Sequence, residues 1–166
     1  MEWFPWLLWL HIFGAIVAFG PIFAIPLIGG MGGKEPMHAN FATRISERIS
    51  HRITLPLAIL QGVTGLGILL VTGRIAHLFE QSNYWLDIAI VLYAITLYTS
   101  LFIQSPRVAK IIEMTSTPPP PPPPNAAPSG PPPALVAAIT ATRQTGMFMT
   151  VMVVAIIFLM VMKPFQ

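Results

Sequence analysis

Four long apolar stretches, separated by shorter polar segments, dominate the pattern of residues along this chain. They cover residues 3–28, 53–73, 84–104 and 141–162. Each is close to the length of roughly 20 residues that a helix needs to cross the hydrocarbon core of a bilayer. We therefore predict an all-α fold, an integral membrane four-helix bundle that forms a single transmembrane domain over residues 1–166.

The segment between the first two stretches has a different pattern. Phe41, Ile45 and Ile49 recur at helical spacing, and basic and acidic side chains occupy the other faces. This arrangement is typical of an amphipathic helix. We expect a short amphipathic helix at the membrane interface, either separate from the second span or continuous with it.

The connection before the last stretch is rich in proline. Residues 115–133 include an unbroken proline run at 118–124, which favours the extended polyproline II conformation. We predict a proline-rich loop that serves either as a semi-rigid spacer or as a docking strip for a partner.

Glycine and proline also mark the first two spans. Gly20 and Pro21 predict a bend near residues 19–21, because proline removes a backbone hydrogen-bond donor. The second span carries small residues that permit close helix approach, and beside them polar side chains that can hydrogen-bond to another helix. These residues are Gly62, Gly65 and Gly67, with Gln61 and Thr64.

Composition indicates a lipid-facing surface. Hydrophobic residues make up 54% of the chain and charged residues 9%, with a mean hydropathy of +0.70, whereas a soluble domain carries about 25% charged residues. The absence of cysteine excludes disulfides and thiolate ligands. The basic residues show none of the aromatic interleaving typical of nucleic-acid binding. The expected partners are therefore membrane lipids and other membrane-protein subunits, and not nucleic acid.

The basic residues are divided unevenly between the two sides of the predicted bundle. One side holds Lys34, Arg44, Arg48, Arg52, Arg107 and Lys110, and the opposite side holds Arg74 and Lys163. Lys and Arg accumulate in cytoplasmic loops. We therefore predict a multi-pass protein of the bacterial inner (cytoplasmic) membrane, with the proline-rich loop in the cytoplasm and both termini in the periplasm. The opening MEWFPW lacks the basic region of a cleavable signal peptide, so we expect the first span to be retained.

His11 is the ionisable side chain that lies deepest in an apolar stretch. It is about eight residues, or roughly 12 Å, below the outer end of the first span, where an unsatisfied imidazole is costly. Three explanations compete: a hydrogen bond to a neighbouring helix, axial ligation of heme b, and ligation of a chlorophyll-type magnesium. A non-heme metal is a fourth and weaker alternative.

Two further residues are weaker candidates for cofactor binding. Met152 lies on the last span at a depth near that of His11, and a thioether is an accepted axial ligand of heme. His51 lies beside Arg48 and Arg52 and could bind an anionic group such as a heme propionate or a lipid phosphate. We interpret Arg143 as an anchor at the membrane interface. No residue set with metal-binding spacing is recognisable, so no metal site and no catalytic residue is predicted.

The residues around His11 carry a resemblance to a known family. The segment WLLWLHIFGAIVAFGPIFAIPLI is similar to the first helix of HemJ-type protoporphyrinogen oxidases, RISHRITLPLAILQGVTGLGILL to the start of their second helix, and MVMKPFQ to their C-terminal KPF. The resemblance implies a heme b held in a four-helix bundle with His11 as the first-helix histidine. The third span, LYAITLYTSLF, has Tyr93 and Tyr98 and no histidine, unlike that family. The chain resembles still more closely a related group of bacterial predicted integral membrane proteins of unknown function.

Three functions are compatible with these observations. The leading one is a non-catalytic accessory or assembly subunit of a larger membrane-embedded redox complex, respiratory or photosynthetic, because the spans hold few polar groups and the proline-rich loop suits docking. The alternative is a membrane redox protein that binds heme b through His11. A transporter or channel comes third. No nucleophile triad, phosphate-binding glycine loop or paired intramembrane carboxylates can be assembled, which argues against a proton pump or a carboxylate-driven transporter. The sequence leans toward a non-catalytic protein without deciding whether it is an enzyme.

Overall fold

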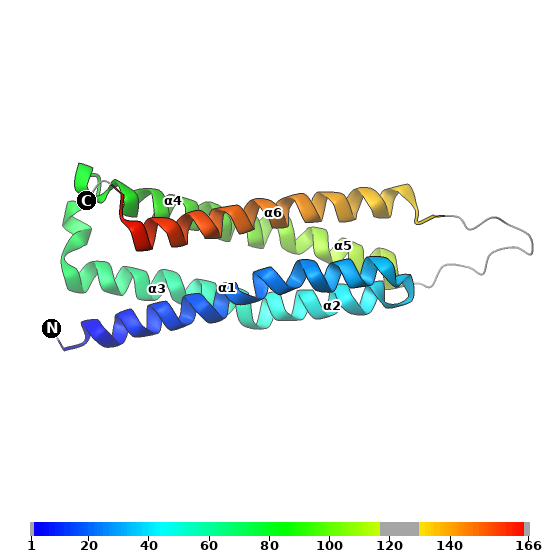
Figure 1. Ribbon diagram of the computed structural model, residues 1–166, viewed down its shortest axis with the longest axis horizontal. Coiled ribbons are helices and arrows are strands. Elements are labelled where there is room, and N and C mark those ends of the chain that lie inside the picture. The colour runs from blue at the N-terminus through cyan, green and yellow to red at the C-terminus, as the bar shows by residue number, and fades with distance from the viewer. Residues whose placement is uncertain (1, 117–129, 165–166) are drawn as a thin grey trace, which may run out of the picture.

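The computed structural model describes residues 2–116 and 130–164, and these residues form helices and their connections without any strand. The predicted all-α bundle is therefore confirmed (Figure 1). Six α-helices are present in the described ranges: α1 (Phe4–Lys34), α2 (Ala39–Ile49), α3 (Leu55–Thr72), α4 (Tyr84–Tyr98), α5 (Ser105–Ser116) and α6 (Pro133–Met162). Two π-helical segments, η2 (Ser50–Thr54) and η5 (Thr99–Gln104), join α2 to α3 and α4 to α5. Short 3-10 turns occupy Pro36–His38, Arg74–His77 and Gln81–Asn83.

In the part of the chain that the structure describes, four continuous helical runs are long and apolar enough to cross a membrane: Phe4–Lys34, Ala39–Thr72, Gln81–Ser116 and Pro133–Met162. They contain 30 to 36 residues, which corresponds to about 45–54 Å at the helical rise. The hydrocarbon core of a bilayer is only about 30 Å thick. Each helix is thus longer than the apolar span predicted from the sequence, and its polar end continues beyond the hydrocarbon. The amphipathic segment is α2, and it is continuous with the second span through η2.

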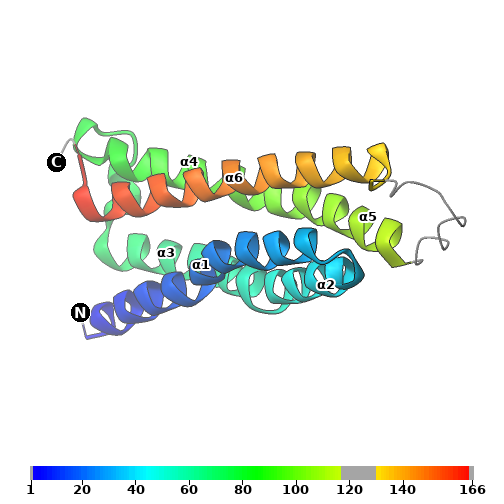
Figure 2. The same cartoon turned by 45° about the vertical axis from the view of Figure 1, so that its right-hand side comes forward.

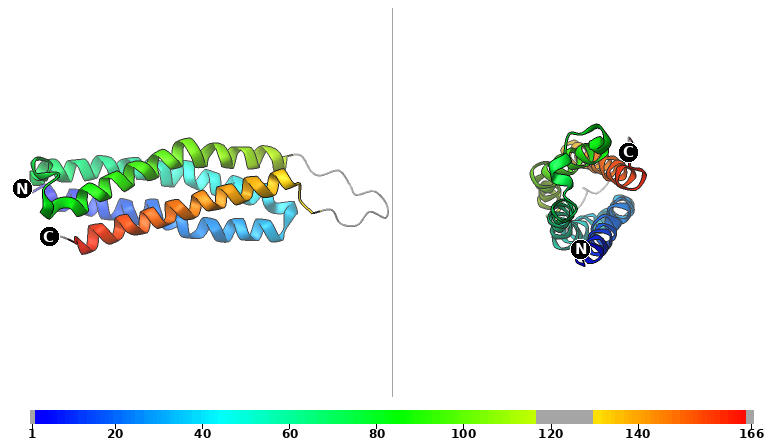
Figure 3. Two further views of the ribbon diagram at one scale, coloured as in Figure 1. Left: turned by 90° about the horizontal axis from the view of Figure 1, so that it is seen from above. Right: turned by 90° about the vertical axis from the view of Figure 1, so that its left-hand side faces the viewer.

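The helices form two hairpins that lie side by side. In the first, α1 packs against α2 and α3, and in the second, α6 packs against α4 and α5. The end-on view in Figure 3 shows these two pairs as the two halves of the bundle. Between the hairpins, α2 contacts α5 and α1 contacts α6.

The two ends of the bundle differ in character. α1 begins and α6 ends at one end, and α5 ends and α6 begins at the other (Figure 1). We call the first the terminal end. We call the second the basic end, because most of the lysine and arginine residues lie toward it: Lys34, Arg44, Arg48, Arg52, Arg107, Lys110 and Arg143.

A compact apolar cluster closes the terminal end. Trp85, Leu86 and Ala89 of α4 are buried there with Leu159 of α6. Two cations approach the Trp85 ring, with Arg74 Cζ 5.7 Å and Lys163 Nζ 5.8 Å from its centroid. Cation–π contacts of this kind stabilise the packing of these segments around Trp85.

α1 remains helical through Pro21 and Pro26. Figure 2 shows its axis changing direction in the middle of the helix, in agreement with the bend predicted near residues 19–21. The change is explained by proline, which removes an i→i−4 hydrogen bond and pushes its ring against the preceding turn.

The proline run at 118–124 lies outside the described residues. Of the predicted loop 115–133, Thr115 and Ser116 are the last residues of α5 and Pro133 is the first residue of α6.

Candidate functional site

His11 lies on α1, half-buried, and faces α3. Its Nδ1 is 2.8 Å from Thr64 Oγ1. Thr64 is 4% exposed, and its hydroxyl lies 3.0 Å from the carbonyl oxygen of Leu60 in the preceding turn. The hydrogen bond to a neighbouring helix, one of the three explanations for an imidazole at this depth, is therefore present.

The hydrogen-bond network around Thr64 assigns the tautomer of His11. A threonine hydroxyl has one hydrogen, and a threonine inside a helix commonly donates it to the carbonyl four residues back. Thr64 thus donates to Leu60 O and accepts from His11 Nδ1–H. In the neutral imidazole Nε2 is then unprotonated, and among the described residues it has no hydrogen-bond partner.

Gln61 supports His11 from the next turn of α3. Its Nε2 donates to the His11 backbone carbonyl at 2.6 Å, which fixes the orientation of the side-chain amide. Its Oε1 is buried and receives no hydrogen bond within the described part of the chain, although the residue is only 6% exposed. An unsatisfied buried acceptor costs about 1–3 kcal/mol. The Gln61 carbonyl group is thus a site where a small donor such as water gains a hydrogen bond.

Glycine allows α1 and α3 to approach each other closely here. A Cβ added to Gly65 would lie 3.3 Å from His11 Cε1, and one added to Gly14 would lie 3.1 Å from Gln61 Nε2. Both distances are tighter than an ordinary van der Waals contact. The cross-helix contact predicted for the glycine-containing second span is therefore formed with α1, and it places the polar pair beside His11.

Tyr93 connects an adjoining face of α3 to the second hairpin. Its hydroxyl donates to the Ala58 carbonyl at 2.9 Å. A Cβ on Gly62 would lie 2.6 Å from that hydroxyl oxygen, so the tyrosine ring packs directly on the glycine. α3 is thereby joined to α1 through His11 and to α4 through Tyr93.

The two weaker candidates do not join His11. Met152 lies half-buried on α6, a helix that contacts α1, and no described interaction links its sulfur to His11. His51 lies in η2 at the basic half, where its Nε2 is 2.9 Å from Ser105 Oγ and 3.6 Å from Glu47 Oε1. Its ring joins the two hairpins, while Arg48 and Arg52 are exposed.

One arginine contact was not anticipated from the sequence. Arg107 Nη1 donates to Thr145 Oγ1 and, at 3.1 Å, to the Ala141 carbonyl. The sequence marked Arg107 only as a basic residue near a loop, because the helical continuation of α5 past the third span was not predicted. A basic pair three residues apart, Arg107 and Lys110, was the available signal. Arg143 is exposed, in keeping with its interpretation as an interface anchor.

The described residues contain no group of three or more histidine, aspartate, glutamate or cysteine side chains that could hold a metal ion. A heme needs less, because a single imidazole nitrogen serves as an axial ligand. The His11 ring is oriented through Nδ1, and no group in residues 2–116 and 130–164 hydrogen-bonds to its Nε2. Heme-ligating nitrogens are commonly supported in this way by a hydrogen bond from the other ring nitrogen.

Comparison with known proteins gives one match. The chain matches the family model described as "Predicted integral membrane protein (DUF2269)" over residues 5–164. Searches of curated proteins and of solved structures give no match.

Proposed function

The chain belongs to this DUF2269 family of predicted integral membrane proteins, and from that premise we propose that it binds one heme b within the membrane, with His11 as an axial ligand. The observation that supports this proposal is the 2.8 Å contact between His11 Nδ1 and Thr64 Oγ1, which orients the ring and points to Nε2 as the nitrogen left for a ligand. Histidine inside a membrane span is costly unless it has a partner or a function. A bound heme supplies one-electron redox chemistry.

Two side chains of α3 prepare His11 for this role. Thr64 holds the ring through Nδ1, and because its own hydrogen is donated to Leu60 O, it cannot reverse the tautomer without losing that bond. Gln61 fixes the backbone of α1 at His11. The support is therefore built entirely from α3, so ligand orientation depends on the packing of α1 against α3.

Two further residues are weaker candidates for contact with the heme. Met152 on α6 is the candidate for a second axial ligand, because its helix contacts α1. His51, with Arg48 and Arg52 on the same helical run, is the candidate for contact with a heme propionate. Replacing Met152 with leucine tests the first assignment, since a methionine–heme bond has its own absorption band that leucine cannot reproduce.

The decisive experiment is an absorption spectrum. The protein is produced with heme supplied, purified in mild detergent, and recorded oxidised and after dithionite reduction. We expect a Soret band, sharp reduced α-bands and about one heme per chain, all lost in His11→Ala. His77→Ala is the matched control, because His77 is exposed and pairs with Glu80 at 2.9 Å in the α3–α4 connection. A colourless protein, or a spectrum that His11→Ala leaves unchanged, contradicts the proposal.

A second candidate is the accessory or assembly subunit of a membrane-embedded redox complex. It is favoured by the outer face of α1, where Trp6, Trp9, Phe13 and Ile16 are each exposed by half or more. Trp9 and Phe13 are already stacked, with ring centroids 5.3 Å apart and planes 6° apart. A rigid aromatic surface of this kind can receive another helix at low entropic cost.

The second candidate makes a different prediction. In native gels of solubilised membranes, the protein should migrate as part of a stoichiometric complex that Trp9→Ala releases and Phe79→Ala does not. Phe79 is the control because it is 81% exposed at the terminal end, away from α1's aromatic face. Migration as an isolated chain in all three proteins would argue against an accessory role.

A further inference from the structure

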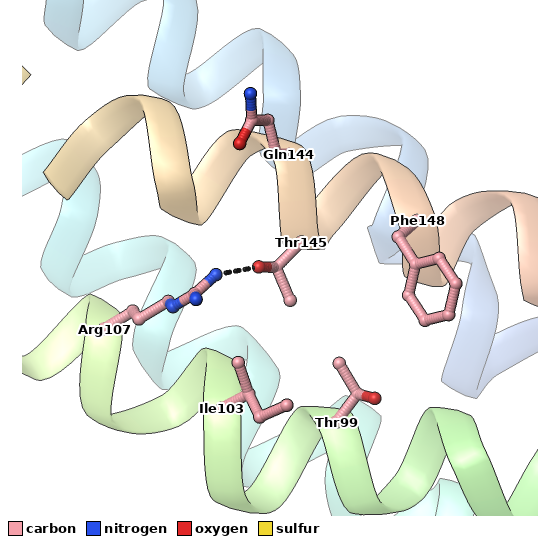
Figure 4. A pocket seen from close by; sticks show the side chains of 6 residues that line it. All are labelled: Thr99, Ile103, Arg107, Gln144, Thr145 and Phe148. Atoms are coloured by element: carbon pink, nitrogen blue, oxygen red, sulfur yellow. Dashed lines mark hydrogen bonds between the residues drawn. The ribbon is translucent and has the colours of Figure 1, made fainter. Parts of the chain in front are cut away.

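Two adjoining hollows lie between α6 and the helix formed by η5 and α5, and they share Arg107. The one farther into the span, of about 330 Å³, is lined by Thr99, Ile103, Arg107, Gln144, Thr145 and Phe148 (Figure 4). The other, of about 410 Å³, lies toward the basic end and is lined by Arg107 and Lys110 and by four alanines, Ala134, Ala137, Ala138 and Ala141. Arg107 lines both hollows, and we call the two together the α5–α6 groove.

Arg107 stands at the middle of this groove and is held in place by α6. Figure 4 shows its guanidinium pointing across the groove to Thr145. Among the described residues, Arg107 uses only Nη1, which donates to Thr145 Oγ1 and the Ala141 carbonyl. An arginine has five N–H donors in a fixed fork, so its remaining donors are free to bind an anion while the bonds to α6 keep the fork oriented.

The positive charge of the groove is not compensated by the described residues. Their three ion pairs all join a histidine to a glutamate, and none includes Arg107 or Lys110. Glu113, one helical turn beyond Lys110, is exposed and pairs with neither cation. The proline-rich segment that follows α5 contains no acidic residue in its sequence. The groove is therefore complementary to an anionic group.

The remaining lining identifies the anion as part of an amphiphile. The four alanines recur at i, i+3, i+4 and i+7 on α6 and leave space beside Arg107 and Lys110. On the other side of Arg107, Ile103 and Phe148 carry an apolar surface deeper into the span. A soluble phosphate would use only the cationic part. A ligand with a phosphate head and an acyl chain would use the whole length of the groove.

We propose that the α5–α6 groove binds an anionic phospholipid, with its phosphate on Arg107 and Lys110 and an acyl chain along Ile103 and Phe148. Basic pockets between membrane helices are suited to anionic lipid headgroups, and the guanidinium fork matches the geometry of a phosphate. The groove lies in the second hairpin, whereas His11 lies in the first. This proposal therefore does not depend on heme binding.

The test is native mass spectrometry of the full chain in mild detergent, titrated with dioleoyl phosphatidylglycerol or dioleoyl phosphatidylcholine. We expect the wild-type protein to retain phosphatidylglycerol preferentially. Lys110→Gln should weaken that retention about fivefold, and Arg107→Gln by at least as much. Arg44→Gln is the matched control, because Arg44 is an exposed basic residue of α2 outside the groove. Equal retention of both lipids, or an equal loss in Arg44→Gln, would overturn the proposal.

Two further measurements keep the test independent of folding. Ala138→Leu fills the groove without removing a charge, so it should abolish phosphatidylglycerol retention while the helical circular dichroism is unchanged. Inorganic phosphate at millimolar concentration should not displace the lipid from the wild-type protein. Displacement by phosphate alone would show that the groove is a site for a soluble anion, and normal lipid retention by Ala138→Leu would show that the lipid binds elsewhere.

Discussion

His11 is held by a side chain whose own hydrogen is already used within its helix. The Thr64 hydroxyl lies 3.0 Å from Leu60 O and 2.8 Å from His11 Nδ1. This double use sets the direction of the hydrogen bond between the helices. The sequence identified Gln61 and Thr64 as polar groups able to bond across helices, and a hydrogen bond to a neighbouring helix was among the explanations for His11. It could not identify which pair forms, because that depends on the rotation of α1 against α3.

Replacing Thr64 with valine removes this support at nearly constant volume. We expect Thr64→Val to weaken heme binding about 10–100-fold, as is typical when the group that orients a ligating histidine is lost. Thr64→Ser keeps the hydroxyl and should bind heme with an affinity near that of the wild type. Titration of the heme-free protein with hemin, followed at the Soret band, gives the three dissociation constants. Equal constants for the valine variant and the wild type would show that Thr64 does not act through His11.

The helices themselves were predictable in number but not in extent. Hydropathy marks the part of a helix that lies in lipid, and it ends where charged residues begin. α2 and α5 are charged continuations of the second and third spans, and they are helical because each hairpin packs them against α1 or α6. The contacts of Arg107 with α6 depend on the helical continuation of the third span. Because the sequence did not predict that continuation, it did not predict these contacts either. The π-helical segments likewise have no signature in the hydrophobic pattern.

Gly62 tests the packing of α3 against α4. A Cβ at this position would lie 2.6 Å from Tyr93 Oη, so the ring must move and its hydrogen bond to Ala58 O is strained or broken. We expect Gly62→Ala to destabilise the folded protein by about 1–3 kcal/mol, as overpacking commonly does. The measurement is the free energy of unfolding in mixed micelles with a graded denaturing detergent.

Gly67→Ala on the same helix is the control for Gly62→Ala. Its Cβ would meet only Leu7 at 3.8 Å, an ordinary contact, so alanine should be neutral or stabilising because it is the better helix former. Combining Gly62→Ala with Tyr93→Phe should recover part of the lost stability, since the hydroxyl that clashes is absent. Equal stability of the Gly62→Ala and Gly67→Ala variants would contradict the packing described here.

The whole molecule consists of two hairpins joined by a few polar contacts. Asn40 Nδ2 donates to the Ile112 carbonyl at 3.1 Å and to Thr115 Oγ1 at 3.0 Å. His51 contacts Ser105, and Tyr93 contacts the backbone of α3. In lipid, such hydrogen bonds and close packing replace the hydrophobic effect as the forces that hold helices together. The bundle architecture followed from the sequence, whereas the division into hairpins required the contacts between helices.

The uneven distribution of basic residues predicts the orientation of the molecule in its membrane. Because the chain has no cysteine, single cysteines report on one side without a background. In spheroplasts, a membrane-impermeant maleimide should label Phe79→Cys at the terminal end. It should label Arg44→Cys on α2 only after the membrane is permeabilised. The reverse labelling pattern would place the basic end outside.

We infer that His11 donates through Nδ1 and presents an unprotonated Nε2. Nitrogen-15 NMR of the imidazole in the heme-free protein tests it directly, with His11 as the sole histidine in a His38→Gln, His51→Gln, His77→Gln variant reconstituted in lipid. We predict that Nδ1 carries the proton and Nε2 does not. In the Thr64→Val background, the ring should no longer favour the tautomer protonated at Nδ1. A neutral ring protonated at Nε2 in the presence of Thr64 would contradict the account.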